Sequence, residues 1–316
     1  MHFVTSLMQR TRIATLAFLS LVGLNSCQDV IDLELEEGER QMVVDGWLTN
    51  DSTQPQELRL SFTTAYFSTE NPPVVNGATA VLHDETTGEE FPYTEVASGL
   101  YRTTAVGVIG HSYSVSVRWE GEEYRSNPEL LSPVSPINAI YSEFDEDDGF
   151  TEEGYYVRIN TFDPVGTGDH YRWRYWINGE LQNDPDDLYV ESDDFVDGNL
   201  IEDFEVTDVI NFYALTEVTI NANGEVRNAD GDEIEGDAVI GVDTAVVTVE
   251  QSSITREAYE FYFLLSEQTA DLGFIFDPPP SPITGNIVRV DQAGTALGYF
   301  GVSAVTRASV VIVNDQ

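Results

Sequence analysis

The sequence predicts a mainly β protein built from two β-sandwich-like domains, the second with one helix and a long acidic loop. Three observations support this fold class. Apolar and polar residues alternate along many short segments, which is the pattern of a strand with one buried face. Turn-forming pairs such as Asn76-Gly77 and Thr87-Gly88 recur between these segments. Apolar residues follow the helical period in a single segment.

The first domain is predicted to span residues 38–132. Its clearest strand covers residues 112–119, where Tyr, Val, Val and Trp fall on one face while three Ser and one Arg fall on the other. Residues 57–62 and 78–82 repeat this alternation. Short strands separated by turn residues at such spacing predict an immunoglobulin- or transthyretin-like sandwich of about seven strands.

A proline-containing boundary precedes the second domain, which is predicted at residues 137–316. Pro133 and Pro136 disfavour both a helix and a central strand. One helix is predicted over residues 254–268, whose apolar residues recur at helical spacing. The long acidic loop is predicted at residues 181–205, which lack a periodic pattern. Strands are predicted at residues 155–161, 170–177, 209–215, 238–250, 286–290, 296–304 and 309–313.

The first 26 residues contain no acid and predict a lipoprotein signal peptide. Arg10 and Arg12 precede an apolar stretch at residues 13–24, which is too short to span a bilayer that requires about 20 residues. The stretch ends in Leu24-Asn25-Ser26-Cys27, which is similar to a bacterial lipobox. We therefore expect Cys27 to carry a covalent lipid, with acyl chains such as palmitate, and to become the mature N-terminus. The alternative is an ordinary secretory signal with an incidental Cys.

Residues 27–37 are strongly acidic and predict either a lipid-anchored tether or an edge strand, because acids alternate there with apolar residues. Acidic residues directly behind a lipidated Cys resemble the signal that sends lipoproteins of Bacteroidota to the cell surface. We therefore expect a lipid-anchored protein of the outer membrane that is exposed at the cell surface.

The charge of the chain is extreme, since 56 Asp and Glu stand against 14 basic residues, all of them Arg, for a formal net charge of −42. A surface this negative excludes nonspecific binding to nucleic acid, because such binding depends on basic side chains that neutralise phosphates. High acid without Lys predicts a halophilic protein, adapted to brine in a salt-loving bacterium. GC-rich coding is an alternative source of the missing Lys, although it does not account for the acids.

No residue pattern in the sequence predicts catalysis, and we expect no enzyme activity. The single Cys excludes internal disulfides, and the four His lack metal-ligand spacing. Calcium is the one cofactor besides the lipid to consider, because it prefers clustered oxygen ligands. Two segments supply such ligands, at Asp193, Asp194 and Asp197 and at Asn228, Asp230 and Asp232. The second segment is also explained as an Asp-Gly hairpin.

The predicted strand at residues 170–177 is the most unusual local feature. Alternation places Arg172 and Arg174 on one face and Tyr171, Trp173 and Tyr175 on the other. One interpretation is that the two Arg pair with nearby acids while the aromatic residues build the core. The other is that both guanidiniums form a contact face for an anionic ligand, such as a carboxylate, or for a partner.

Short motifs near both ends of the mature chain carry a family resemblance. They resemble the opening and closing motifs of an uncharacterised family of Bacteroidota outer-membrane lipoproteins, at residues 27–33, 42–49, 283–287 and 296–303. Residues 76–82 and 99–101 are similar to the carboxypeptidase-regulatory or transthyretin-like sandwich of that family. The resemblance implies an accessory lipoprotein that works with a TonB-dependent outer-membrane receptor in nutrient capture or uptake. A structural or adhesive surface lipoprotein without a transport role is the alternative.

Overall fold

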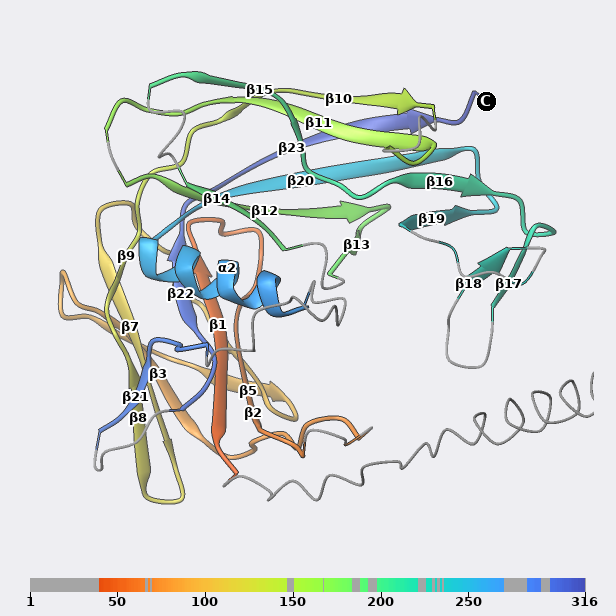
Figure 1. Cartoon of the computed structure of the whole chain (residues 1–316). Coiled ribbons are helices and arrows are strands. Elements are labelled where there is room, and N and C mark those ends of the chain that lie inside the picture. Colours follow the sequence, from red (N-terminus) through yellow and green to blue (C-terminus); the bar gives the residue numbers. More distant parts are fainter. Residues whose placement is uncertain are drawn as a thin grey trace, which may run out of the picture. The chain divides into compact units, whose positions relative to one another are not determined.

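The computed structural model describes residues 40–65, 68, 70–146, 151–166, 168–183, 188–192, 198–220, 226–228, 231, 234, 236–269, 283–290 and 296–315 (Figure 1). Within these residues the protein is mainly β and contains one helix, which confirms the predicted fold class. The predicted signal peptide, Cys27 and the acidic segment 27–37 lie outside them. No helix in the described part of the chain is long and apolar enough to cross a membrane.

Two sheets pack into the first sandwich, and alternating side chains from both fill its core, among them Leu60, Tyr101 and Val115. One sheet has the strand order β22 (Phe300–Ser303), β1 (Met42–Thr49), β2 (Gln56–Phe62), β6 (Leu100–Thr103) and β5 (Thr94–Ala97). The other has the order β21 (Ile287–Arg289), β8 (Glu122–Ser126), β7 (Ser112–Trp119), β3 (Thr79–Asp84) and β4 (Glu90–Pro92), with β9 (Glu129–Leu130) also paired to β7.

The chain returns to the first sandwich near its C-terminus. Strand β22 pairs in parallel with β1, from Gly46 beside Phe300 to Thr49 beside Ser303. Strand β21 pairs antiparallel with β8. Residues 287–303 therefore complete two sheets begun by residues 42–130, a connection that crosses the predicted proline-containing boundary.

Two further sheets form the second sandwich, whose core includes Ile159, Trp173 and Val247. One sheet has the order β10 (Ile137–Asp145), β11 (Gly154–Phe162), β16 (Ile210–Tyr213) and β19 (Asp237–Ile240), with β15 (Leu200–Glu205) also paired to β11. The other has the order β13 (Glu180–Leu181), β12 (His170–Ile177), β20 (Thr244–Ile254) and β23 (Val305–Val313), with β14 (Tyr189–Ser192) also paired to β12. A separate hairpin consists of β17 (Val218–Ile220) and β18 (Val226–Asn228).

Helix α2 (Arg256–Thr269) follows β20 directly (Figure 1). The hydroxyl of Thr255 accepts a hydrogen bond from the Ala258 amide at 3.2 Å and so caps the first turn. The predicted helix is therefore confirmed, but its start at Ile254 was two residues early, because Ile254 still belongs to β20. Ile254, Ala258 and Tyr299 form a small third core that joins the helix to the first sandwich.

A buried carboxylate lies beside this third core. Glu129 of β9 is only 4% exposed and accepts hydrogen bonds from Tyr299 Oη at 2.6 Å, from Asn286 Nδ2 at 3.2 Å and from the Thr255 hydroxyl. Burial raises the pKa of Glu129, although the three hydrogen bonds oppose this shift. One acid thus links the first sandwich to the start of the helix.

Two predicted segments differ from the structure. The single strand predicted at residues 238–250 is wrong, because Gly241 adopts a left-handed φ of 75° and sends β19 and β20 into different sheets. The acidic loop predicted at residues 181–205 contains strands β14 and β15. Strand β15 was not predicted, because two irregularities interrupt its alternation of apolar and polar residues. Asp203 has a φ of 56°, and the register of β15 against β11 shifts.

Candidate functional site

Strand β12 shows the alternation that the sequence predicts. Tyr171, Trp173 and Tyr175 are buried in the core of the second sandwich, whereas Arg172 and Arg174 lie half-buried on the opposite face. This face is turned toward the first sandwich, because Arg172 Cζ lies 5.5 Å from the centre of the Trp47 ring of β1. Both arginines therefore lie between the two sandwiches.

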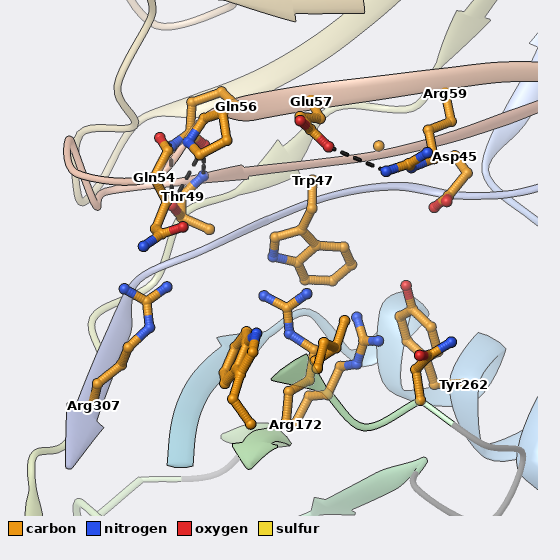
Figure 2. A pocket seen from close by; sticks show the side chains of 16 residues that line it. Asp45, Trp47, Thr49, Gln54, Gln56, Glu57, Arg59, Arg172, Tyr262 and Arg307 are labelled. Atoms are coloured by element: carbon orange, nitrogen blue, oxygen red, sulfur yellow. Dashed lines mark hydrogen bonds and ion pairs between the residues drawn. The ribbon is translucent and has the colours of Figure 1, made fainter. Parts of the chain in front are cut away.

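A pocket of about 660 Å³ separates the two sandwiches at this point (Figure 2). Its volume falls within the range of roughly 300–1,000 Å³ that is typical of small-molecule sites. Strands β1 and β2 supply one wall, with Asp45, Trp47, Glu57 and Arg59. The second sandwich and helix α2 supply the other, with Arg172, Arg174, Trp176, Arg307 and Tyr262. Figure 2 shows the Trp47 indole projecting from its strand toward Arg172.

Two of the arginines are held by one buried acid. The Glu250 side chain is 0% exposed, and its Oε1 accepts hydrogen bonds from Arg174 at 3.1 and 2.5 Å, while its Oε2 pairs with Arg307. Arg307 also pairs with Asp51, in the turn between β1 and β2. A buried carboxylate needs such partners, because removal of either one leaves an uncompensated charge. For Arg174, pairing with a nearby acid is therefore the interpretation that holds.

Arg172 has a different environment. Its guanidinium carbon lies 4.1 Å from the centre of the Tyr262 ring and 5.5 Å from that of Trp47. Within the described part of the chain, no carboxylate forms an ion pair with this guanidinium. Burial lowers the pKa of Arg172, which still leaves an Arg side chain charged at neutral pH. Arg172 therefore presents a charged guanidinium to the pocket. This group has more N–H donors than the surrounding side chains have acceptor atoms for them.

Strand β22 holds the Trp47 indole in place on the side away from Arg172. Trp47 Nε1 donates a hydrogen bond of 2.7 Å to the Ser303 hydroxyl of β22. Gly301 lies under the indole, since a Cβ at that position would be 2.1 Å from Trp47 Cζ3. The returning strand β22 thus sets the position of Trp47 in the pocket.

Two acids on the same wall differ in their partners. Glu57 accepts hydrogen bonds from Arg102 at 2.9 and 2.6 Å and from Arg59 at 3.4 Å. The Asp45 carboxylate makes neither a hydrogen bond nor an ion pair with any described residue. Asp45 keeps solvent-accessible surface in the pocket, yet the protein atoms crowded around it raise its pKa, against the lowering effect of Arg172. Its exposed surface leaves the carboxylate accessible to a ligand.

The predicted calcium ligands fall mostly outside the described residues, namely Asp193, Asp194, Asp197, Asp230 and Asp232. Asn228 is described and ends strand β18, where it pairs with Val218 of the hairpin. In the described ranges, no group of three or more His, Cys, Asp or Glu side chains is arranged to hold a metal. Calcium binding stays a prediction, which a calorimetric titration with calcium tests.

Most residues of the pocket were not predicted from the sequence. Asp45, Arg59 and Arg307 look like ordinary solvent-facing members of alternating strands, and only their convergence in space distinguishes them. One local signal was present for Arg172 and Arg174, because two cations adjoin four aromatic residues in a chain with few cations.

The fold and the pocket define a class of protein: a pair of β-sandwiches, closed by a returning strand, with a ligand-sized cavity between them. The chain belongs to the family described as a domain of unknown function, DUF4249, whose model matches residues 28–309. This match confirms that the chain is a member of an uncharacterised family over most of its length. No curated protein matches the chain.

Proposed function

We propose that the protein is a non-catalytic, lipid-anchored binding protein of the outer-membrane surface, which captures a nutrient for a TonB-dependent receptor. The observation that carries the binding role is the pocket between the sandwiches, where Arg172 faces a ligand-sized space without a carboxylate partner among the described residues. A concave site with aromatic walls and a few placed polar groups supports capture of a small solute.

The location and the partner rest on other support. The apolar stretch that ends at Cys27 supports a lipid anchor, and the terminal motifs resemble a family that works with TonB-dependent receptors. Membership in the matched family assigns neither, because its description names no function.

Fractionation of cells tests the anchor. We expect the wild-type protein in the outer-membrane pellet and open to protease on intact cells, whereas Cys27→Ala releases it from the pellet. Ser26→Ala is the matched control, because it keeps a small residue before the lipidated Cys and should leave the protein in the pellet. A Cys27→Ala variant that stays in the pellet contradicts the lipid anchor.

Affinity purification from detergent-solubilised outer membranes tests the partner. We expect a large outer-membrane receptor to be recovered with the wild-type protein in amounts close to equimolar. Recovery of the protein alone contradicts the accessory role and favours a structural or adhesive surface protein.

A further inference from the structure

We infer that the pocket binds a small carboxylate ligand with a single negative charge, in which a hydrogen-bond donor lies beside the carboxylate group. This inference rests on the proposed binding function and adds the chemical class of the ligand. It comes from the balance of charges and hydrogen-bond partners around the pocket (Figure 2).

The concentration of arginine is the first argument. Four of the 14 Arg line this one pocket, in a chain with 56 acids where a carboxylate partner is easily found. Arg59, Arg174 and Arg307 do have acid partners, at Glu57, Glu250 and Asp51. Arg172 is the exception among the described residues. Asp45 and Glu250 attract this guanidinium through space, but neither forms an ion pair with it. A carboxylate in direct contact is therefore the group that its position lacks.

The way Arg172 is held is the second argument. The faces of Tyr262 and Trp47 lie against the guanidinium and fix it in place by cation–π contacts. Ring faces do not satisfy the N–H donors at the edge of the guanidinium plane, which has five, and the Tyr262 hydroxyl engages only part of them. A carboxylate accepts two of them side by side, and this geometry makes a carboxylate the preferred partner of a preorganised Arg.

The acids of the pocket limit the ligand to one negative charge. Asp45 lies on the wall formed by β1 and β2, where its carboxylate would repel a second anionic group. Glu57 on the same wall contributes less, because Arg102 and Arg59 already pair with it. Arg174 and Arg307 offer little compensation, because Glu250 already occupies both. Asp45 feels the nearby arginines through space but makes no hydrogen bond or ion pair with a described residue. Its carboxylate therefore suits a ligand group that donates a hydrogen bond, either a hydroxyl or an ammonium.

Two kinds of small molecule share this chemistry, a sugar acid with hydroxyl donors and a short peptide with an ammonium donor. Calorimetric titration of the purified, lipidated, full-length mature protein in detergent compares them, with D-glucuronate and alanyl-alanine as probes. D-glucose and alanyl-alanine amide are their matched partners without the carboxylate. We expect one of the two acids to bind at least about tenfold more tightly than its partner, which corresponds to one charge-assisted hydrogen-bond pair.

Variants of the pocket identify the groups involved. Arg172→Gln should weaken the bound acid by about tenfold or more, and Arg172→Lys should weaken it less, because it keeps the charge without the planar fork. Arg118→Gln is the matched control outside the pocket and should change the affinity by no more than about twofold, since Arg118 pairs with Glu123 on the exposed surface of the first sandwich. Asp45→Asn separates the two ligand kinds, because it should weaken an ammonium ligand by about tenfold and a hydroxyl ligand by less.

Two results would overturn the inference. One is that neither acid binds more tightly than its carboxylate-free partner. The other is that Arg172→Lys and Arg172→Gln, with unchanged melting temperatures, bind the acid like the wild type; if Arg172→Gln does not fold, the Lys variant alone decides. These results leave the co-purification with a receptor untouched, so the failure of the ligand class and the failure of the proposed function are distinguishable.

Discussion

Gly298 lies where the C-terminal part of the chain passes close to the backbone of β1, and it allows a sharp test of how the first sandwich is closed. Its φ is 90°, and a Cβ added there would lie 2.2 Å from the Val44 carbonyl oxygen. Real contacts need at least 3.0 Å, so a Gly298→Ala variant must move one backbone away from the other. Two hydrogen bonds flank the clash, from Val44 N to Leu297 O and from Gly46 N to Tyr299 O.

The expected loss follows from these contacts. The left-handed conformation costs an Ala residue about 1–2 kcal/mol, and two weakened hydrogen bonds add about 1 kcal/mol each. We therefore expect Gly298→Ala to lower the free energy of unfolding by about 3–4 kcal/mol. Gly110→Ala is the control, because Gly110 has a φ of 87° but nothing within 4 Å of an added Cβ. It should lose only the conformational part, about 1–2 kcal/mol.

Urea unfolding, followed by tryptophan fluorescence and far-ultraviolet circular dichroism, measures both variants with linear extrapolation to water. The decisive quantity is the difference between the two losses. Equal losses for Gly298→Ala and Gly110→Ala would refute the close approach of residues 297–299 to β1.

Three more perturbations test other parts of the structure. Burial raises the pKa of Glu129 in the folded protein, so ionising this carboxyl lowers the free energy of unfolding. The stabilisation by Glu129 is therefore complete below the ordinary pKa of Glu and declines as the pH rises through the raised pKa. The melting temperature of Glu129→Gln relative to wild type should therefore increase between about pH 4 and pH 7, and a constant difference would argue against this assignment. Gly301→Ala should push the Trp47 indole toward the pocket and weaken the bound acid, whereas Ser303→Ala should be milder; titration of both shows whether Trp47 is held as described. The melting temperature of the wild type should rise between dilute buffer and 1 M salt, where the Debye length of about 3 Å screens repulsion among the 56 acids; an unchanged value would contradict adaptation to brine.

Strict alternation was the reliable signal for the fold. Strands β7 and β12 were predicted with their observed ends, because each has one buried and one polar face without interruption. Prediction failed where the backbone leaves the regular pleat, as at Gly241 and at Asp203. Alternation reports the two faces of a strand but carries no information about which strand lies beside it, and so the pairing of β22 with β1 was not foreseen.

The pocket was predictable only in part, for a related reason. The sequence places Arg172 and Arg174 on one face of a strand and leaves open whether acids or a ligand meet them. In the folded protein the two arginines have different neighbours. Glu250 lies opposite Arg174 in the neighbouring strand, whereas Arg172 contacts aromatic rings from β1 and α2. These neighbours come from segments far apart in the chain, which no local pattern connects.

The returning strand β22 also determines when the molecule can complete its fold. Trp47 and its hydrogen-bond partner Ser303 are 256 residues apart in the chain. The open edge of β1 therefore has no partner until nearly the whole chain has been synthesised, and a contact of such sequence separation forms slowly because a long loop must close first. Since both the hydrogen bond to the Trp47 indole and the backbone beneath it come from this strand, the binding site is expected to be among the last parts of the protein to form.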